Sequence, residues 1–86
     1  MKLEETGLTF EDIKEKVNKY MIETYERMDF LAESAKDQYI YNEKGEKYLD
    51  FYAGIAVNSA GSCNEKVVKA VVDQAQTLMH TFNYPY

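Results

Sequence analysis

The sequence predicts an α+β fold, in which a small antiparallel sheet built on a β-hairpin lies between an N-terminal helix and a second helix. Three observations support this prediction. Apolar residues recur at helical spacing over residues 10–28 and again over residues 65–80. Between these stretches, aromatic and β-branched residues flank a short polar segment that ends in glycine, which is typical of a hairpin. The chain has 86 residues, so we expect a single small segment, 1–86, rather than several domains.

The composition disfavours several classes of protein. The net charge is −5 and basic residues form no patch, which argues against nucleic-acid binding. No apolar run reaches the roughly 18 residues that a membrane helix needs, so we expect no membrane association. The single cysteine, Cys63, fits a reducing compartment, and we expect a cytoplasmic protein.

The first part of the chain is expected to hold a helix. Residues 1–8 are polar, and we expect a frayed arm. Thr9 is a suitable N-cap for a helix over residues 10–28, because its hydroxyl can accept a hydrogen bond from the first turn. Glu11 and Asp12 lie in that turn, where the helix dipole favours negative charge. The apolar stripe of this helix is expected to pack on a sheet or a partner.

The middle of the chain is expected to form the hairpin, over residues 38–52. Its turn, "NEKG", places Gly45 where a left-handed residue is needed. Alternation puts large apolar groups on both faces of the two strands, and an isolated hairpin cannot bury both. Residues 30–35 are ambiguous, and a short strand is left open.

A small-residue loop is expected over residues 53–63, "AGIAVNSAGSC", in which "IAV" is compatible with a brief buried strand. Gly54 and Gly61 permit tight turns or a close approach of the backbone. Asn64 is a suitable N-cap for the second helix, over residues 65–80. Its valines lower the helix propensity, so we expect tertiary packing to hold it.

No catalytic constellation is evident in the sequence. His80 is the only histidine, and a charge–dipole role at a helix C-terminus explains it. Cys63 has neither a second cysteine nor a nearby histidine, so a metal site is not expected, and a buried thiol is the simpler interpretation. Asp50 lies among aromatic residues, where it either accepts backbone hydrogen bonds or points to water.

From residue 38 onward the sequence carries a recognisable pattern. "GEKYLDF" is followed by "GIAVNSAGSC", then by "VVKAVVDQ" and finally by "HTFNYPY". This order resembles the N-terminal region of the class III (subgroup II) pyridoxal-phosphate-dependent aminotransferases, which include the acetylornithine, ornithine and 4-aminobutyrate aminotransferases. The matching residues are Gly45, Tyr48, Leu49, Asp50, Phe51, Gly54, Ile55, Ala56, Val57, Asn58, Gly61, Cys63, Val67, Val68, Ala70, Gln74, His80, Asn83 and Tyr86.

The chain departs from the family pattern at turns and caps. Ser62 stands where the family usually has histidine, and Asn64 and Glu65 replace the usual His-Pro pair. Asn42 replaces the hairpin aspartate. These positions bear on local geometry rather than on membership of the family.

The resemblance implies the N-terminal part of the small domain of a fold-type I enzyme. The full-length family uses pyridoxal phosphate (PLP) to transfer an amino group between an (ω-)amino acid and a 2-oxo acid. Its phosphate-binding loop, its aspartate for the pyridine nitrogen and its Schiff-base lysine all come later than this region. The resemblance therefore implies that this chain alone binds no cofactor, carries no catalytic, cofactor-binding or metal-binding residue, and is inactive.

The resemblance also implies which residues shape the substrate side. Gly54, Ile55 and Val57 match a segment at the mouth of the active site, where small residues let the backbone pass close to the substrate. Tyr84 and Tyr86 match a segment near the active site of the dimer partner. The implied partners are the remainder of the aminotransferase or a homodimer partner.

Two other interpretations remain open. The first is a stand-alone α+β interaction or dimerisation module without catalysis, which the two-sided aromatic hairpin suggests. The second is a small thiol protein that uses Cys63.

Overall fold

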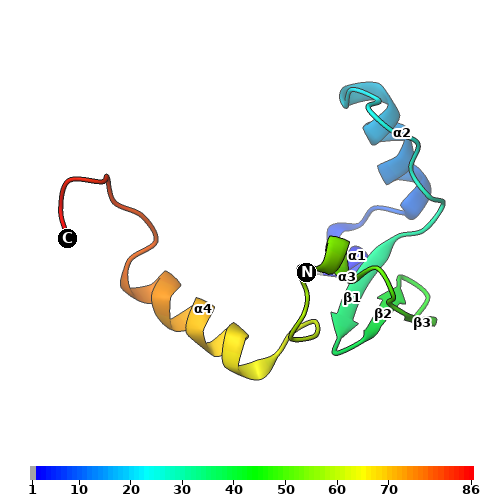
Figure 1. The fold of residues 1–86 in the computed structure, drawn as a ribbon. Helices are drawn as coiled ribbons and strands as arrows, with labels where there is room; N and C mark the ends of the chain where they lie inside the picture. The colour runs from blue at the N-terminus through cyan, green and yellow to red at the C-terminus, as the bar shows by residue number, and fades with distance from the viewer. Residues whose placement is uncertain (1) are drawn as a thin grey trace.

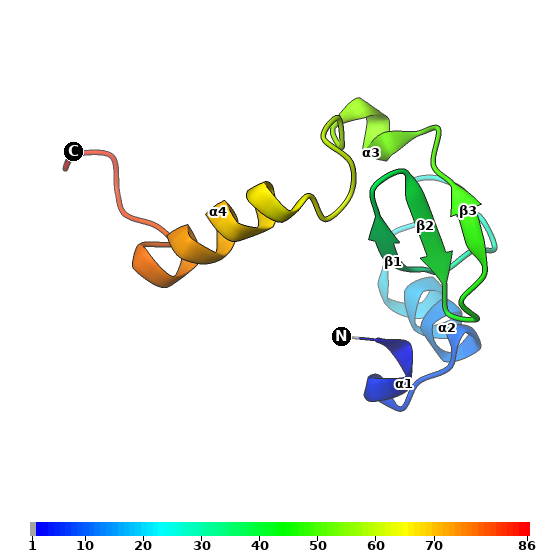
Figure 2. The same cartoon turned by 90° about the horizontal axis from the view of Figure 1, so that it is seen from below.

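The computed structural model describes residues 2–86 and shows an α+β arrangement (Figure 1). The elements in chain order are α1 (Leu3–Thr6), α2 (Phe10–Tyr20), β1 (Ala32–Lys36), β2 (Tyr39–Asn42), β3 (Lys47–Leu49), α3 (Ala53–Ala56) and α4 (Glu65–Thr77). The strands form one antiparallel sheet in the order β1-β2-β3. In both views α4 extends away from this sheet, so the C-terminal residues lie at the far end of the molecule (Figure 1, Figure 2).

The arm that the sequence predicts to be frayed contains the short helix α1. Gly7 ends α1 with a φ of 69°, in the left-handed region that suits glycine. The backbone N–H of Leu3 donates to Glu33 Oε1 in β1 at 2.8 Å. The expectation of a frayed arm over residues 1–8 is therefore wrong for residues 3–7, because a bond to a distant part of the chain orders them.

The start of α2 follows from its N-cap. Thr9 Oγ1 accepts a hydrogen bond from the Asp12 N–H at 3.1 Å, and Asp12 Oδ2 accepts one from the Thr9 N–H at 2.8 Å. This reciprocal pair is a capping box, which satisfies two N–H groups that the helix itself leaves free. The sequence therefore predicts the beginning of this helix correctly.

The expected end of this helix, at residue 28, is wrong. α2 ends at Tyr20, and Met21 already has an extended backbone, with φ −107° and ψ 143°. The residues that follow, 22–25, are partly β-branched and aromatic and have weak helix propensity. The chain turns back instead, and Lys14 Nζ in α2 pairs with Asp29 Oδ1 at 2.8 Å.

The sheet carries aromatic groups on both faces, as the alternation predicts. Ile40 and Tyr48 are paired across β2 and β3, and the ring of Phe30 meets the Tyr48 ring edge-on at a centroid distance of 5.0 Å. On the other face, Lys47 Nζ lies 3.7 Å from the centroid of the Tyr39 ring. The ambiguous stretch 30–35 supplies most of β1, which pairs antiparallel with β2.

The hairpin turn is organised by Asn42, the one buried residue among those described, at 6% exposure. Its Oδ1 accepts hydrogen bonds from the N–H groups of Lys44 and Glu46, at 3.1 and 2.8 Å. Its Nδ2 donates to Glu46 Oε2 at 2.6 Å. Gly45 has a φ of 78°, the left-handed conformation expected at that point of the turn. Both the oxygen and the nitrogen of the Asn42 side-chain amide therefore make hydrogen bonds that hold the turn.

α4 begins at its predicted cap but ends before residue 80. Asn64 Oδ1 accepts hydrogen bonds from the N–H groups of Lys66 and Val67, at 3.1 and 3.4 Å. The last helical residue is Thr77, and Leu78 is extended, with φ −160°. Thr77 Oγ1 donates back to the Asp73 carbonyl oxygen at 2.8 Å, a bond that weakens a helix at its end.

The described residues form no apolar core. No hydrophobic side chain in residues 2–86 is buried, and the accessible surface is 8044 Å². A compact protein of this length would expose about 5,200 Å². The radius of gyration is 16.7 Å, against about 12 Å for a compact domain of this size. None of the helices in the described part of the chain is long and apolar enough to cross a membrane.

The hairpin turn should weaken in acid. Hydrogen bonds from Asn42 Nδ2 and Tyr48 Oη lower the pKa of the Glu46 carboxyl below its ordinary value of 4.5. Since the folded form favours the ionised carboxyl, its stabilising effect is complete above pH 4.5 and is lost as the pH falls through the lowered pKa. Cross-strand nuclear Overhauser effects between β2 and β3, followed through that range, should fade at the acid end.

Two variants test whether Glu46 causes the pH dependence of the hairpin turn. Glu46→Gln should abolish this pH dependence, because its amide does not titrate. Glu43→Gln, in the same turn but outside these hydrogen bonds, should leave it unchanged. An identical acid profile in the Glu46→Gln chain would contradict the assignment.

Candidate functional site

The candidate site is the loop that joins β3 to α4, and its central feature is a left-handed turn. Ala53, Gly54, Ile55 and Ala56 have φ values of 51°, 60°, 63° and 62°. The Ala56 N–H donates to the Tyr52 carbonyl at 3.1 Å, so α3 is one turn of left-handed helix. Left-handed helical conformation costs roughly 1–2 kcal/mol for each residue that has a Cβ. The surrounding contacts must therefore hold it in place.

The carboxylate of Asp50 lies at the entrance to this turn. Asp50 Oδ1 accepts hydrogen bonds from the backbone N–H groups of both Tyr52 and Ala53, each at 2.9 Å. Hydrogen bonds to an ionised acceptor are roughly twice as strong as those between neutral groups. Of the two interpretations left open for Asp50, the structure supports hydrogen bonding to the backbone. The sequence leaves the choice open because the conformation of the following residues is not evident from it.

Both ends of the loop are attached to the same short turn between β1 and β2. The Asp50 N–H donates to the Gln38 carbonyl at 2.8 Å. Asp37 and Ser62 exchange two backbone hydrogen bonds, each at 2.8 Å. Residues 50–62 thus form a loop whose ends lie side by side, which we call the Ω loop.

The closing contact of the Ω loop requires a glycine. Gly61 has a φ of 81°, and a Cβ at this position would lie 3.2 Å from the Asp37 Cα. The Gly61 N–H also donates to the Asn58 carbonyl at 2.9 Å. The close backbone approach predicted for this glycine is therefore present, and the segment that it meets is the β1–β2 turn.

The Ω loop encloses an open cavity of about 350 Å³. Asp37, Gln38, Asp50, Asn58 and Ser59 are among the residues that line it, so its chemistry is polar and acidic. No group of three or more histidine, cysteine, aspartate or glutamate residues in residues 2–86 has the geometry of a metal site. Cys63 is exposed rather than buried.

The structure brings together three of the five site residues that the resemblance implies. Gly54, Ile55 and Val57 lie on or directly after the left-handed turn, and the side chains of Ile55 and Val57 are about three-quarters exposed. The brief buried strand considered for "IAV" is therefore wrong. Tyr84 and Tyr86 follow α4 in the chain and are fully exposed. The segment after α4 runs to the C-terminus far from α3 in both views (Figure 1, Figure 2). The described chain does not bring the two groups together.

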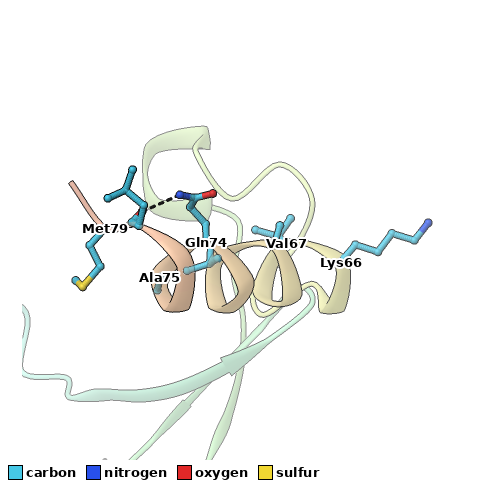
Figure 3. Close-up of a pocket in the computed structure, with 8 residues that line it drawn as sticks. Lys66, Val67, Gln74, Ala75 and Met79 are labelled. Carbon is cyan, nitrogen blue, oxygen red and sulfur yellow. Dashed lines mark hydrogen bonds between the residues drawn. The ribbon is translucent and has the colours of Figure 1, made fainter. Parts of the chain in front are cut away.

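A second surface, which is apolar, lies along α4. Val67 and Gln74 project from the same side of the helix, and Gln74 Nε2 donates to the Leu78 carbonyl at 2.7 Å (Figure 3). The shallow groove on this face has a volume of about 630 Å³. Its valines are 53–62% exposed, so the packing expected to hold this helix is not supplied by the described residues.

Comparison with known proteins relates this architecture to a family of enzymes. The aminotransferase class-III family matches residues 20–85. Acetylornithine aminotransferase of Methanocaldococcus jannaschii is 46% identical over 68 residues, which are 79% of this chain and 17% of that protein. The mitochondrial acetylornithine aminotransferase of Neurospora crassa is 43% identical over 67 residues, which are 78% of this chain and 14% of that protein. The chain thus spans less than a fifth of the length of these relatives.

Solved structures show the same fold. Acetylornithine aminotransferase of Elizabethkingia anophelis has a TM-score of 0.83 at 25% identity, over 88% of this chain and 20% of that chain. An ornithine aminotransferase of Toxoplasma gondii, described as having partial occupancy of PLP at its active site, has a TM-score of 0.80 at 28% identity. That match covers 91% of this chain and 19% of the other.

Substituting the closing glycine should open the Ω loop. In Gly61→Ala, the added Cβ meets the Asp37 backbone, so the amides of Asp37 and Ser62 should exchange with solvent at least about tenfold faster, a change of about 1.4 kcal/mol. Hydrogen exchange followed by NMR measures this. Gly7→Ala is the matched control, because Gly7 also has a positive φ but an added Cβ there would have no neighbour within 4 Å. Equal exchange of the Asp37 and Ser62 amides in the two variants would contradict the proposed contact.

Proposed function

Because the chain belongs to the class-III aminotransferase family, we propose that it forms the N-terminal portion of an enzyme that transfers an amino group between an (ω-)amino acid and a 2-oxo acid. The observation that carries this proposal is the family match, which spans residues 20–85 and includes the whole Ω loop. The relatives named above are acetylornithine and ornithine aminotransferases, which supports an ornithine derivative as the amino donor.

The exposed surface supports a role inside a larger protein. The chain exposes 8044 Å², about 2,800 Å² more than the roughly 5,200 Å² of a compact protein of this length. A typical stable interface covers only about 800 Å² on each partner. The excess therefore exceeds what one ordinary partner covers, and it favours burial against an extensive body of polypeptide.

Within that enzyme, the Ω loop is proposed to shape the substrate side of the active site. Gly54, Ile55 and Val57 are its substrate-facing residues, and the exposure of the latter two side chains leaves them free to make such contacts. Tyr84 and Tyr86, which lie apart from the loop, are proposed to approach the active site of a homodimer partner. None of these groups makes or breaks a bond.

The Ω-loop cavity does not fit PLP on its own. A phosphate needs cationic or N–H donors, and the cofactor needs a desolvated lysine. The residues lining the Ω-loop cavity include two aspartates and no lysine or arginine. We therefore assign the binding of the cofactor to the remainder of the aminotransferase.

The cellular location and the partners of the enzyme are also proposed. The single cysteine fits a reducing compartment, and we propose a cytoplasmic location. The proposed partners are protein rather than nucleic acid or membrane, since the net charge of −5 disfavours both anionic surfaces.

Two observations favour a second candidate, a non-catalytic interaction or dimerisation module. Aromatic groups lie on both faces of the hairpin, and α4 exposes an apolar stripe. Light scattering distinguishes the two candidates: an 86-residue chain that forms a stable, cooperatively folded dimer supports the module, whereas a weakly folded chain that needs further polypeptide supports the enzyme segment.

A chimera tests the enzymatic proposal. Residues 1–86 replace the matching segment of the Methanocaldococcus jannaschii acetylornithine aminotransferase, and N-acetylornithine and a 2-oxo acid serve as substrates. The chimera should bind PLP and retain transaminase activity, because this chain supplies an equivalent substrate-side loop. The same relative without the segment should be inactive and is the reference.

A complementary measurement uses the 86-residue chain itself. Mixed with PLP and passed through gel filtration, it should retain no cofactor absorbance and show no activity. A stoichiometric cofactor band that survives gel filtration, or a soluble PLP-loaded chimera without transaminase activity, would overturn the proposal.

A further inference from the structure

We propose that Asp50 is a positioning residue, whose carboxylate holds the start of the left-handed turn and so keeps Gly54 and Ile55 in place in the active site. The role in the active site rests on the proposed function. The effect on the backbone is independent of it and is argued from the geometry of the Ω loop.

The handedness of the backbone changes at the two residues that Asp50 contacts. Tyr52 is right-handed, with φ −92° and ψ −32°, and Ala53 is left-handed, with φ 51°. Successive N–H groups across such a change of hand converge on one point and form a concave anion site, a nest. Asp50 Oδ1 occupies that point and accepts both hydrogen bonds at 2.9 Å.

The contacts within the loop hold the turn together with this carboxylate. The Ala56 N–H donates to the Tyr52 carbonyl at 3.1 Å, and the N–H groups of Val57 and Asn58 both donate to the Ala53 carbonyl. The attachments at Gln38 and at Asp37 fix the ends of the Ω loop. The carboxylate of Asp50 is the side-chain contact at the start of the turn, where it holds the N–H groups of Tyr52 and Ala53.

The position of the Ile55 side chain depends on whether the turn stays left-handed. Its side chain is 75% exposed, so no packing within the described residues holds it. Its direction is therefore set by the backbone of the turn alone. If the turn relaxes to negative φ, Ile55 points elsewhere while the ends of the loop remain attached.

The backbone part of the proposal is tested on the 86-residue chain by NMR. One-bond Cα–Hα and three-bond couplings distinguish positive from negative φ at Ala53, Ile55 and Ala56. Asp50→Ala should lose positive φ at these residues, whereas Asp50→Asn, which keeps an acceptor oxygen, should retain it. Asp73→Ala, which removes an exposed carboxylate from α4, is the matched control and should change nothing in the loop.

A second measurement covers the case in which Asp50→Ala unfolds. In Asp50→Asn, loss of the charge should speed hydrogen exchange of the Tyr52 and Ala53 amides by about tenfold, because charge-assisted bonds are about twice as strong as neutral ones. Positive φ retained in a folded Asp50→Ala chain overturns the proposal, and so do unchanged exchange rates in Asp50→Asn.

The role in the active site is tested in the chimera described above. Asp50→Ala should lower kcat/KM for N-acetylornithine by about a hundredfold, the effect expected of a displacement near 1 Å, without loss of bound PLP. The loss should be smaller for a short amino donor that does not reach Ile55, and Asp50→Asn should restore most of it. Equal losses for long and short donors would indicate a merely structural role and overturn the assignment.

The two proposals fail in different ways. An inactive chimera with an unmodified segment counts against the proposed function, while the NMR measurements on the 86-residue chain still decide whether Asp50 sets the turn. An active chimera in which Asp50→Ala has full kcat/KM retains the proposed function and overturns the positioning role.

Discussion

The β1–β2 turn at Asp37 and Gln38 is the constraint on which the rest of the structure depends. It joins two strands of the sheet, and its backbone also holds both ends of the Ω loop. These contacts are backbone hydrogen bonds, so they place the loop without reference to side-chain identity. Everything after β3 is positioned through them, since α4 extends away from the sheet (Figure 2). Because no apolar core forms among the described residues, such backbone hydrogen bonds determine much of the structure.

The features that the sequence predicts well are those decided by a few adjacent residues. Thr9 and Asn64 cap their helices as expected, and Gly45 takes the left-handed conformation at the hairpin turn. In each case the hydrogen-bonding or conformational need is met within three residues of the side chain that meets it. Contacts with distant residues rarely override a preference that is decided so locally. The alternating pattern of the hairpin is predicted for the same reason, because its two strands are neighbours in sequence.

The features that the sequence does not predict depend on distant residues. The helix that begins at Phe10 stops at Tyr20, although its apolar spacing continues. Beyond this point the chain turns back, and Asp29 pairs with Lys14 of the helix. The left-handed turn is hidden in the same way, since Ala, Gly, Ile and Ala form an ordinary apolar stretch. The contacts that hold it come from the Asp50 carboxylate and from the loop ends attached at the β1–β2 turn. The direction of α4 and the place of Tyr84 are not fixed by local chemistry at all.

The departures from the family pattern are consistent with this difference between local and distant contacts. Ser62 contributes its backbone N–H and carbonyl to the bridge with Asp37, so the bridge does not depend on a histidine side chain. Asn64 supplies the cap and Glu65 a negative charge in the first turn of α4, which together suit a helix N-terminus without proline. The frame of the Ω loop therefore tolerates changes of side chain where it uses only the backbone. The side chains of Ile55 and Val57 are exposed and form no part of that frame, so they can change while the loop that carries them keeps its shape.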